Sequence, residues 1–308
     1  MVWSRDLSNH WKFLRAFCWT HLFSSKAVES QAALRKEKVS EMTDFLSSRK
    51  GKTVKNSEIL FGAILNTLGN LFFSKDLCDL DYESSTKLGA MPNISDFYPL
   101  FDALDLQGLR KQTELYQNQL QAISRGRSDF LDVMIDSGFS DLQINISLPE
   151  LIVVGSDTTT STIEWARAEL LRNNGAMHKL QAELTSKIGE NDIITESNIS
   201  ELPYLAACVK ETLRIHPPTP FLIPRHAPET CKIMDYSIPK NSSSYHLVGR
   251  RICPGLPFAR QEVHLILASL IHHFKWSLPN GEDPMQLDMK EKFGVTLQKE
   301  KSLLVVPI

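Results

Sequence analysis

The chain of 308 residues lacks a cysteine framework, a surplus of either charge and a long apolar run. Its five cysteines are scattered and odd in number, and no two form a C-x-x-C pair, so a zinc site or a disulfide framework is not expected. A reducing, cytosol-like environment fits such cysteines best. The 34 basic and 36 acidic residues leave a net charge of −2, which points to neither nucleic acid nor acidic lipid as a partner.

No stretch approaches the roughly 18 consecutive apolar residues that a membrane helix needs, and charged residues interrupt the first 25 positions. We therefore expect no membrane span and no signal peptide in this chain. The apolar content of 42% is ample for a globular core, as one large domain or two smaller ones. The function must then lie in local sites.

Apolar residues recur mostly at helical spacing, so the sequence predicts a mainly α-helical protein with a few strands. Several segments carry this pattern, and the last residues alternate weakly enough to predict a terminal β-hairpin. The expected helices cover residues 11–42 and beyond, 57–73, 107–123, 149–172, 177–188, 202–213 and 258–274.

The stretch GRRICPG, residues 249–255, places Cys253 between two glycines and behind two arginines. Glycines let backbone N–H groups approach a sulfur, and arginines make the surroundings electropositive, as a thiolate requires. An apolar helix follows, and its positive N-terminal end favours a thiolate further. The alternative is a loop cysteine that packs as a small hydrophobic residue.

A second unusual stretch is the helix expected to begin at Pro149, where a first-turn proline is common. Its centre holds Gly155, Asp157, Thr158 and further hydroxyl residues, which are poor choices for the inside of a helix. Such a conflict is typical of a helix that lines a site. The alternative is that these hydroxyls form a surface cap at a helix start that lies further along the chain.

Two further pairs stand at helical spacing. Trp11 and Arg15 lie one turn apart, so an indole N–H and a guanidinium can bind the same anion. The alternative is an arginine at the edge of a helix that extends its charged end into water. Glu211 and Arg214 can form an ion pair, which by itself is a weak signal. Arg225, in the extended segment that follows, can reach a ligand carboxylate.

Taken in order, W-x-x-x-R from Trp11, G-S-D-T-T from Gly155, E-x-x-R from Glu211 and G-R-R-I-C-P-G from Gly249 resemble the motifs of a cytochrome P450. Each motif is weak alone, but their order is specific, and the resemblance extends from Trp11 to the C-terminus. The residues around these motifs resemble those of the plant branch of the family, which contains geraniol 8-hydroxylase and related terpenoid and alkaloid hydroxylases.

The resemblance implies a mainly α fold with small β elements, a single P450-like domain over residues 1–308, and haem b as the cofactor. Cys253 would be the axial ligand of the haem iron, with electrons pushed from its sulfur toward the iron. The positions that match cofactor-binding residues of the family are Cys253, Trp11, Arg15, Arg225, Arg251, Gly249 and Gly255.

Other positions match catalytic, structural and substrate-facing residues. Asp157 and Thr158 match the acid and alcohol pair that delivers protons, and Gly155 matches the residue that leaves a groove for oxygen. Glu211 and Arg214 match a structural pair beneath the haem. The substrate-facing turns correspond to Phe221, Leu222, Phe293 and Val295.

The implied activity is insertion of one atom of O2 into a small apolar substrate, terpenoid-like or alkaloid-like. Electrons would come from NADPH through NADPH-cytochrome P450 reductase. Members of the family sit on the cytosolic face of the endoplasmic reticulum through an N-terminal anchor, which is not seen in this chain, so a cytoplasmic location is the alternative.

The sequence also departs from the family pattern. The anchor, first sheet and first helices of the family are not found before Trp11, and only residues 241–248 stand where the family has several tens of residues before the cysteine loop. His246 occupies a position that is normally aromatic. The alternative function is therefore a non-catalytic P450 remnant with weak or no haem binding.

Overall fold

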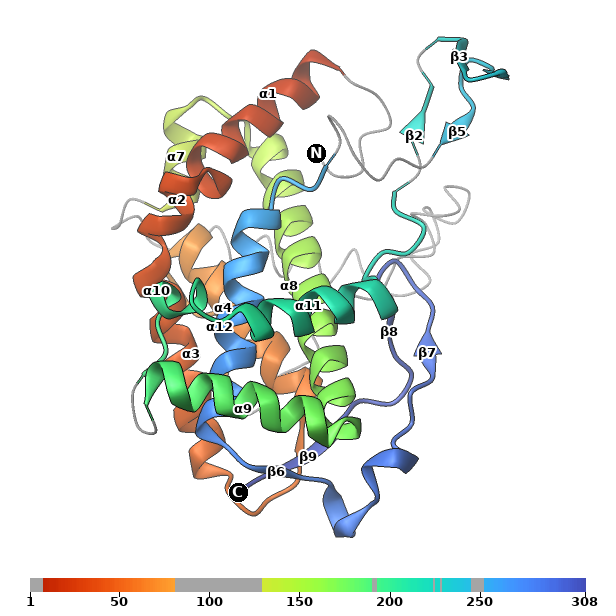
Figure 1. Ribbon diagram of the computed structural model, residues 1–308. Helices are drawn as coiled ribbons and strands as arrows, with labels where there is room; N and C mark the ends of the chain where they lie inside the picture. The colour runs from red at the N-terminus through yellow and green to blue at the C-terminus, as the bar shows by residue number, and fades with distance from the viewer. Residues whose placement is uncertain (1–7, 81–128, 190–192, 224, 228, 245–251) are drawn as a thin grey trace, which may run out of the picture.

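The computed structural model describes residues 8–80, 129–189, 193–223, 225–227, 229–244 and 252–308, and is mainly α-helical, as the sequence predicts (Figure 1). The expected helix over residues 107–123 lies outside the described residues. The helices are α1 (Asn9–Cys18), the π-helix η1 (Trp19–Phe23), α2 (Ser25–Ser30), α3 (Ala32–Ser48), α4 (Asn56–Phe73), α7 (Phe130–Asp136), α8 (Asp141–Arg172), α9 (Asn174–Ile188), α10 (Glu196–Ile199), α11 (Pro203–Ile215) and α12 (Leu256–His273).

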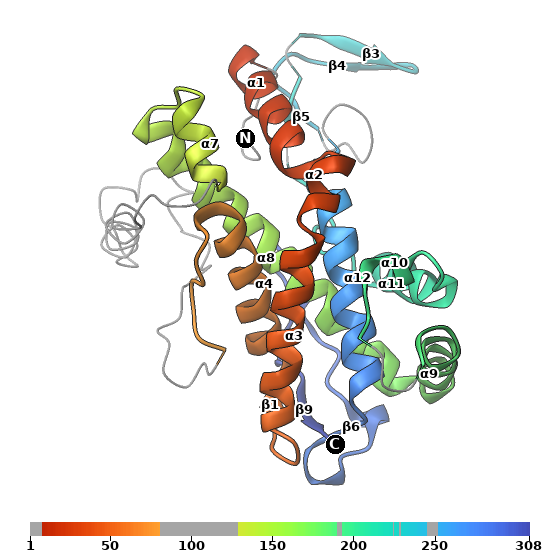
Figure 2. The same ribbon diagram turned by 90° about the vertical axis from the view of Figure 1, so that its left-hand side faces the viewer.

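Helix α8 is the centre of the molecule. It packs most extensively against α4 and also contacts α12, α11 and α9, whereas α12 in turn contacts α3. Figure 2 shows α9, α10 and α11 gathered on one side of the molecule, beyond α12. The middle of α12 is fully buried, with Leu265, Ile266 and Leu267 at 0% exposure, which confirms the buried helix expected after the cysteine loop.

The first region is helical beyond residue 42, as expected, but it is divided into several consecutive helices. Five residues of π-helix follow α1, and Ser24 is extended, with φ −64° and ψ 155°. Its side chain accepts a hydrogen bond from the backbone N–H of Ala27 and thereby caps α2. Serine favours such a cap because its short hydroxyl competes with the helix for backbone groups.

Helix α8 begins eight residues earlier than the sequence analysis predicts. Ser140 and Gln143 form a reciprocal capping box, and Pro149 lies inside the helix rather than at its start. The hydroxyl residues are buried, with Thr159 at 4% and Thr162 at 4% exposure, so their interpretation as a surface cap is wrong. A proline removes only one backbone donor, and the flanking turns of this 32-residue helix remain intact.

Small sheets lie at the edges of the helical body. Strand β9 pairs antiparallel with β1, ahead of α4, and with β6, just after α12. The terminal hairpin predicted from the sequence is therefore wrong for the last strand, although β7 and β8 do form a hairpin before it. The strands are β1 (Val54–Lys55), β2 (Arg225–His226), β3 (Cys231–Ile233), β4 (Tyr236–Ile238), β5 (Ser243–Ser244), β6 (Trp276–Ser277), β7 (Glu291–Lys292), β8 (Gln298–Lys299) and β9 (Leu304–Pro307), with 3-10 turns η3 (Pro279–Gly281) and η4 (Pro284–Gln286) between β6 and β7.

The buried face of α11 differs from the predicted stripe at its end. Leu205 and Val209 are buried as expected, but Leu213 is 38% exposed and Thr212 is buried in its place. Seven residues make almost two full helical turns, so Thr212 falls in line with Leu205, whereas Leu213 is rotated away.

Arg35 of α3 joins three elements inside the molecule. Its side chain is fully buried and pairs with Glu196 of α10. It also donates to the carbonyl oxygen of Val28 at 2.5 Å and lies 5.2 Å from the ring centre of Phe258 in the first turn of α12. A buried charge that loses its partner is strongly destabilising, so this cluster helps to fix the start of α12.

We predict that Arg35→Ala lowers the free energy of unfolding by about 3–5 kcal/mol, because Glu196 would be left without its partner. Chemical denaturation followed by circular dichroism measures the change. The exposed neighbour Lys36→Ala is the matched control and should change stability by less than about 0.5 kcal/mol. Equal effects of the two substitutions would contradict the assignment.

Candidate functional site

The cysteine loop ends at the first residue of α12. Gly255 is the N-cap of that helix, and Cys253 lies two residues before it. The backbone N–H groups of Gly255 and Leu256 act to lower the pKa of the Cys253 thiol. A Cβ added to Gly255 would stand 3.8 Å from that sulfur. The sulfur therefore lies over the positive end of a helix, as the sequence predicts.

Arg15 of α1 reaches this loop from a distant part of the chain. Its Nη2 donates to the carbonyl oxygen of Ile252 at 2.6 Å, and its guanidinium lies 5.5 Å from the ring centre of Trp11. Trp11 is 6% exposed. Trp11 and Arg15 therefore share one face of α1, as their spacing predicts. Through Arg15, this face contacts the cysteine loop.

The charge state of Cys253 reflects two opposing effects. Part of the residue contacts solvent. The protein around its thiol nevertheless raises the pKa, and the two backbone N–H groups and Arg15 oppose that rise without cancelling it. Burial likewise lowers the pKa of Arg15, and Cys253 acts against that shift. Binding to iron would replace the thiol proton, so the surroundings of Cys253 fit a thiolate that would hold an iron.

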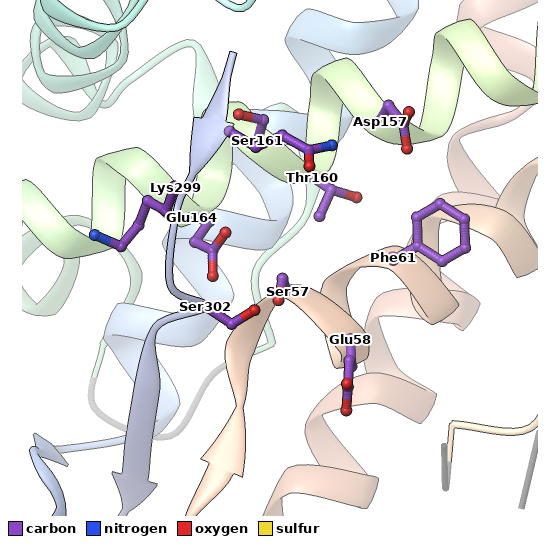
Figure 3. Close-up of a pocket in the computed structure, with 10 residues that line it drawn as sticks. Ser57, Glu58, Phe61, Asp157, Thr160, Ser161, Glu164, Lys299 and Ser302 are labelled. Atoms are coloured by element: carbon purple, nitrogen blue, oxygen red, sulfur yellow. The ribbon is translucent and has the colours of Figure 1, made fainter. Parts of the chain in front are cut away.

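Asp157 of α8 lines a polar pocket between α8, the start of α4 and strand β8 (Figure 3). Glu58 of α4, Glu164 of α8 and Lys299 of β8 line the same pocket. Burial raises the pKa of Asp157 to about 6, so its carboxyl can hold or release a proton near neutral pH. This is the range in which an acid that moves protons is effective.

Thr158, next to Asp157, is half-buried, and its hydroxyl donates to the carbonyl oxygen of Val154 at 2.7 Å. Hydroxyls that bond to the preceding turn in this way loosen a helix locally. Gly155 faces α4, because a Cβ there would stand 3.0 Å from Cδ1 of Leu68. Close packing against α4 thus explains why a glycine stands at position 155. The expected role of Gly155 beside oxygen stays a prediction.

Glu211 and Arg214 form the ion pair that their spacing in the sequence predicts. The guanidinium donates twice to the carboxylate, at 2.8 and 2.7 Å. Both side chains are more than half exposed, at 55% for Glu211 and 69% for Arg214. Exposed ion pairs contribute little to the free energy of unfolding, so this pair stabilises α11 only weakly.

The expected substrate-facing turns lie side by side. The rings of Phe221 and Phe293 meet edge to face, with 5.7 Å between their centres. The backbone N–H of Leu297 donates to the carbonyl oxygen of Pro218 at 2.8 Å and joins the two segments. Leu222 is half-buried with a left-handed φ of 55°. Val295 is 38% exposed. Their contact with a substrate stays a prediction.

Three of the predicted positions cannot be placed in this site. Gly249, Arg251 and His246 lie outside the described residues. Arg225 belongs to β2, where its backbone is paired with Ser244 of β5, and its side chain lies outside the described part of the chain. Their roles stay predictions.

Sequence reasoning missed two contributors to the pocket at Asp157. Glu164 stands seven residues after Asp157 on α8, a spacing that returns to the same helix face and could have revealed it. Lys299 arrives from β8, more than a hundred residues away, and no local pattern predicts that contact.

Comparison with known proteins gives one family. A model of the family described as Cytochrome P450 matches residues 2–244 and 248–306. The short break between the two matched parts falls inside the segment that the sequence analysis expects to be shortened, ahead of the cysteine loop. No helix in the described ranges is both long enough and apolar enough to cross a membrane.

Several curated plant proteins are similar over the whole chain. The probable (S)-N-methylcoclaurine 3'-hydroxylase isozyme 2 of Coptis japonica is 38% identical over 371 aligned positions, which cover 99% of this chain and 76% of the relative. The (S)-N-methylcoclaurine 3'-hydroxylase isozyme 2 of Eschscholzia californica is also 38% identical, over 100% of this chain and 76% of the relative. Geraniol 8-hydroxylase of Catharanthus roseus is 34% identical, over 100% of this chain and 77% of the relative.

The alignment with the Coptis protein is longer than the chain itself, at 371 positions against 308 residues. The relative therefore carries internal residues that have no counterpart in this chain.

We predict that Asp157→Asn stabilises the protein at pH 8 and much less at pH 5. Burial raises the pKa of Asp157 from 3.8 to about 6. The stability that the protonated Asp157 contributes to the folded state is therefore complete below pH 3.8. That contribution is lost as pH rises through about 6. The asparagine side chain does not ionise, so the variant avoids this loss. Thermal unfolding midpoints across this pH range measure the difference.

The exposed Asp44→Asn in α3 is the control and should show no such pH-dependent gain. A difference between Asp157→Asn and the parent protein that stays constant from pH 5 to pH 8 would show that Asp157 does not ionise in a buried setting.

Proposed function

Because this chain belongs to the cytochrome P450 family and is a monooxygenase of that family, we propose that it inserts one atom of O2 into a small alkaloid-like or terpenoid-like substrate. The observation that supports this best is the setting of Cys253. Two backbone N–H groups at the N-terminus of α12 act to lower the pKa of its thiol, and so does Arg15, which donates to the carbonyl oxygen of the preceding Ile252. Such a setting favours a thiolate that would hold a haem iron.

Haem b is the cofactor that the family implies, and when bound it supplies the oxygen activation needed to oxidise unactivated C–H bonds. Cys253 would hold its iron. Trp11 and Arg15, stacked beside the loop, would hold a propionate through an indole N–H and a guanidinium. Arg225, Arg251, Gly249 and Gly255 are proposed to complete the binding site by their match to the family motifs.

Asp157 and Thr158 are proposed to move protons in the reaction. The carboxyl of Asp157 changes charge near neutral pH, as proton transfer requires. The hydroxyl of Thr158 can exchange its bond to the Val154 carbonyl for one to a bound partner without any change of the helix. The alcohol would then orient the proton that the acid supplies.

The class of substrate is proposed from the names of the relatives and from the exposed aromatic pair. The Coptis and Eschscholzia relatives are named as hydroxylases of N-methylcoclaurine, and the Catharanthus relative as a hydroxylase of geraniol. Phe221 and Phe293 present two exposed rings in an edge-to-face pair, an apolar surface suited to a flat or branched apolar molecule. Leu222 and Val295 are proposed to extend this surface.

NADPH-cytochrome P450 reductase is proposed as the source of electrons, and the cytosolic face of the endoplasmic reticulum as the place of action, both by analogy with the family. A non-catalytic role with weak or no haem binding is the second candidate. The exposure of the Glu211–Arg214 pair and the internal residues that only the relatives carry favour it.

Turnover tests the proposal. The chain is supplied with haemin, a plant reductase, NADPH and isotopically labelled oxygen gas, and is then given N-methylcoclaurine or geraniol. We expect a hydroxylated product that carries one labelled oxygen atom and disappears in Cys253→Ser. A product without label, or the same yield from Cys253→Ser, would contradict the proposed reaction.

We predict that Thr158→Ala consumes NADPH but forms about a hundredfold less product per NADPH, the lower end of what a positioned proton donor contributes. Thr162→Ala is the matched control, since its hydroxyl donates to a helix carbonyl, that of Thr158, in the same way at 2.8 Å. Unchanged coupling in Thr158→Ala would remove the role assigned to this alcohol.

A further inference from the structure

His216 ends α11, and its side chain is buried against the central helix. Its backbone N–H donates to the carbonyl oxygen of Thr212 at 2.7 Å, and the side chain is 7% exposed. The imidazole lies flat on the indole of Trp165, with 3.8 Å between the ring centres and 8° between the planes. Trp165 belongs to the second half of α8 and is fully buried. The core therefore fixes the plane of the His216 ring.

Each ring nitrogen of His216 meets a carboxylate from a different element. Nε2 lies 2.9 Å from Oε1 of Glu169 in α8, and Nδ1 lies 3.2 Å from Oε1 of Glu291 in β7. An ionised carboxylate accepts hydrogen bonds and does not donate them, so both ring nitrogens carry a hydrogen when both bonds are made. The imidazole is then a cation between two anions, and both hydrogen bonds are strengthened by charge.

The two carboxylates differ in their access to water. The side chain of Glu169 is 22% exposed, whereas that of Glu291 is 46% exposed. Lys299 of β8 is the partner of Glu291 in the register of the two strands, and its Nζ lies 4.8 Å from the ring centre of Trp165. His216 is thus anchored on the side of α8, and its bond to β7 is the outer one.

His216 stands at the root of both segments that carry the exposed aromatic pair. Phe221 follows His216 by five residues, and Phe293 follows Glu291 by two. Their rings meet edge to face, with 5.7 Å between the centres. Figure 1 shows β7 and β8 beside the end of α11. The bond from His216 to Glu291 therefore joins the two segments close to the point where their rings meet.

We propose that His216 is a positioning residue for the substrate. Anchored on α8, it binds Glu291 and so holds the turn between β7 and β8 against the segment that follows α11. Phe293 on the turn then meets Phe221 on that segment in a fixed geometry. The inference rests on the proposed contact of these two rings with the substrate, and it gives a charged contact outside the aromatic surface a part in substrate selection.

Glu291→Ala tests the proposal, because Glu291 is the more exposed partner and its truncation leaves the ring stack in place. Hydrogen exchange of the haem-supplied chain, followed by mass spectrometry, measures how often the turn opens. The backbone N–H of Leu297 donates to the carbonyl oxygen of Pro218 at 2.8 Å and reports this opening. We expect the peptide that contains Leu297 to exchange about tenfold faster, the equivalent of one hydrogen bond to a charged group.

Three further variants make the exchange measurement specific. Glu291→Gln should stay within about threefold of the parent, since its amide oxygen still accepts from Nδ1. Glu300→Ala, which removes an exposed carboxylate just after β8, is the matched control and should match the parent. In a His216→Gln background, Glu291→Ala should add less than about twofold, because both residues act through one bond. Glu291→Ala alone carries the test should His216→Gln fail to fold.

Turnover of N-methylcoclaurine or geraniol gives a second readout. We expect KM to rise about threefold to tenfold in Glu291→Ala, the scale of one lost aromatic contact, and kcat to stay within about twofold. A general loss of stability would instead reduce the amount of active enzyme and leave KM unchanged. Glu300→Ala should leave both constants unchanged.

The outcomes separate the two proposals. If Glu291→Ala speeds exchange at Leu297 while the parent forms no product, the contact stands as the device that holds the turn, and the proposed reaction fails. If product forms but Glu291→Ala matches Glu300→Ala in exchange or in KM, the role of His216 is overturned and the proposed reaction stands. Exchange in Glu291→Gln as fast as in Glu291→Ala would also overturn it.

Discussion

The site depends on one contact between distant parts of the chain, the hydrogen bond from Arg15 to the carbonyl oxygen of Ile252 at 2.6 Å. It joins α1 to the loop that precedes α12. Cys253 follows directly, and two backbone N–H groups at the α12 N-terminus act to lower the pKa of its thiol. The cation therefore serves the fold and the electrostatics together, since it fixes the loop and opposes the rise in the pKa of the thiol.

The second constraint is the composition of α8. A central helix normally carries apolar residues, but α8 has a polar stripe that begins at Asp157 and includes Thr160 and Glu164. Capping by Ser140 and the packing of α4 against Gly155 hold the helix in place despite these residues.

Local patterns predicted the parts of the structure that depend on neighbours in sequence. The shared face of Trp11 and Arg15 and the burial of α12 follow from helical spacing and were confirmed. The start of α8 was wrong because a capping box at Ser140 outweighs a proline as a helix signal. The position of Lys299 in the lining of the pocket at Asp157, and the pairing of β9 with strands from two distant regions, depend on the tertiary fold and have no local signal.

The central claim is that Cys253 is the ligand of a haem iron in this protein. The most direct measurement is the carbon monoxide difference spectrum of the reduced, haem-supplied chain, recorded for the parent, Cys253→Ser and Cys208→Ser. We expect the band typical of thiolate-ligated haem in the parent and in Cys208→Ser, and its loss in Cys253→Ser alone. Absence of the band in the folded parent, or its survival in Cys253→Ser, would contradict the account.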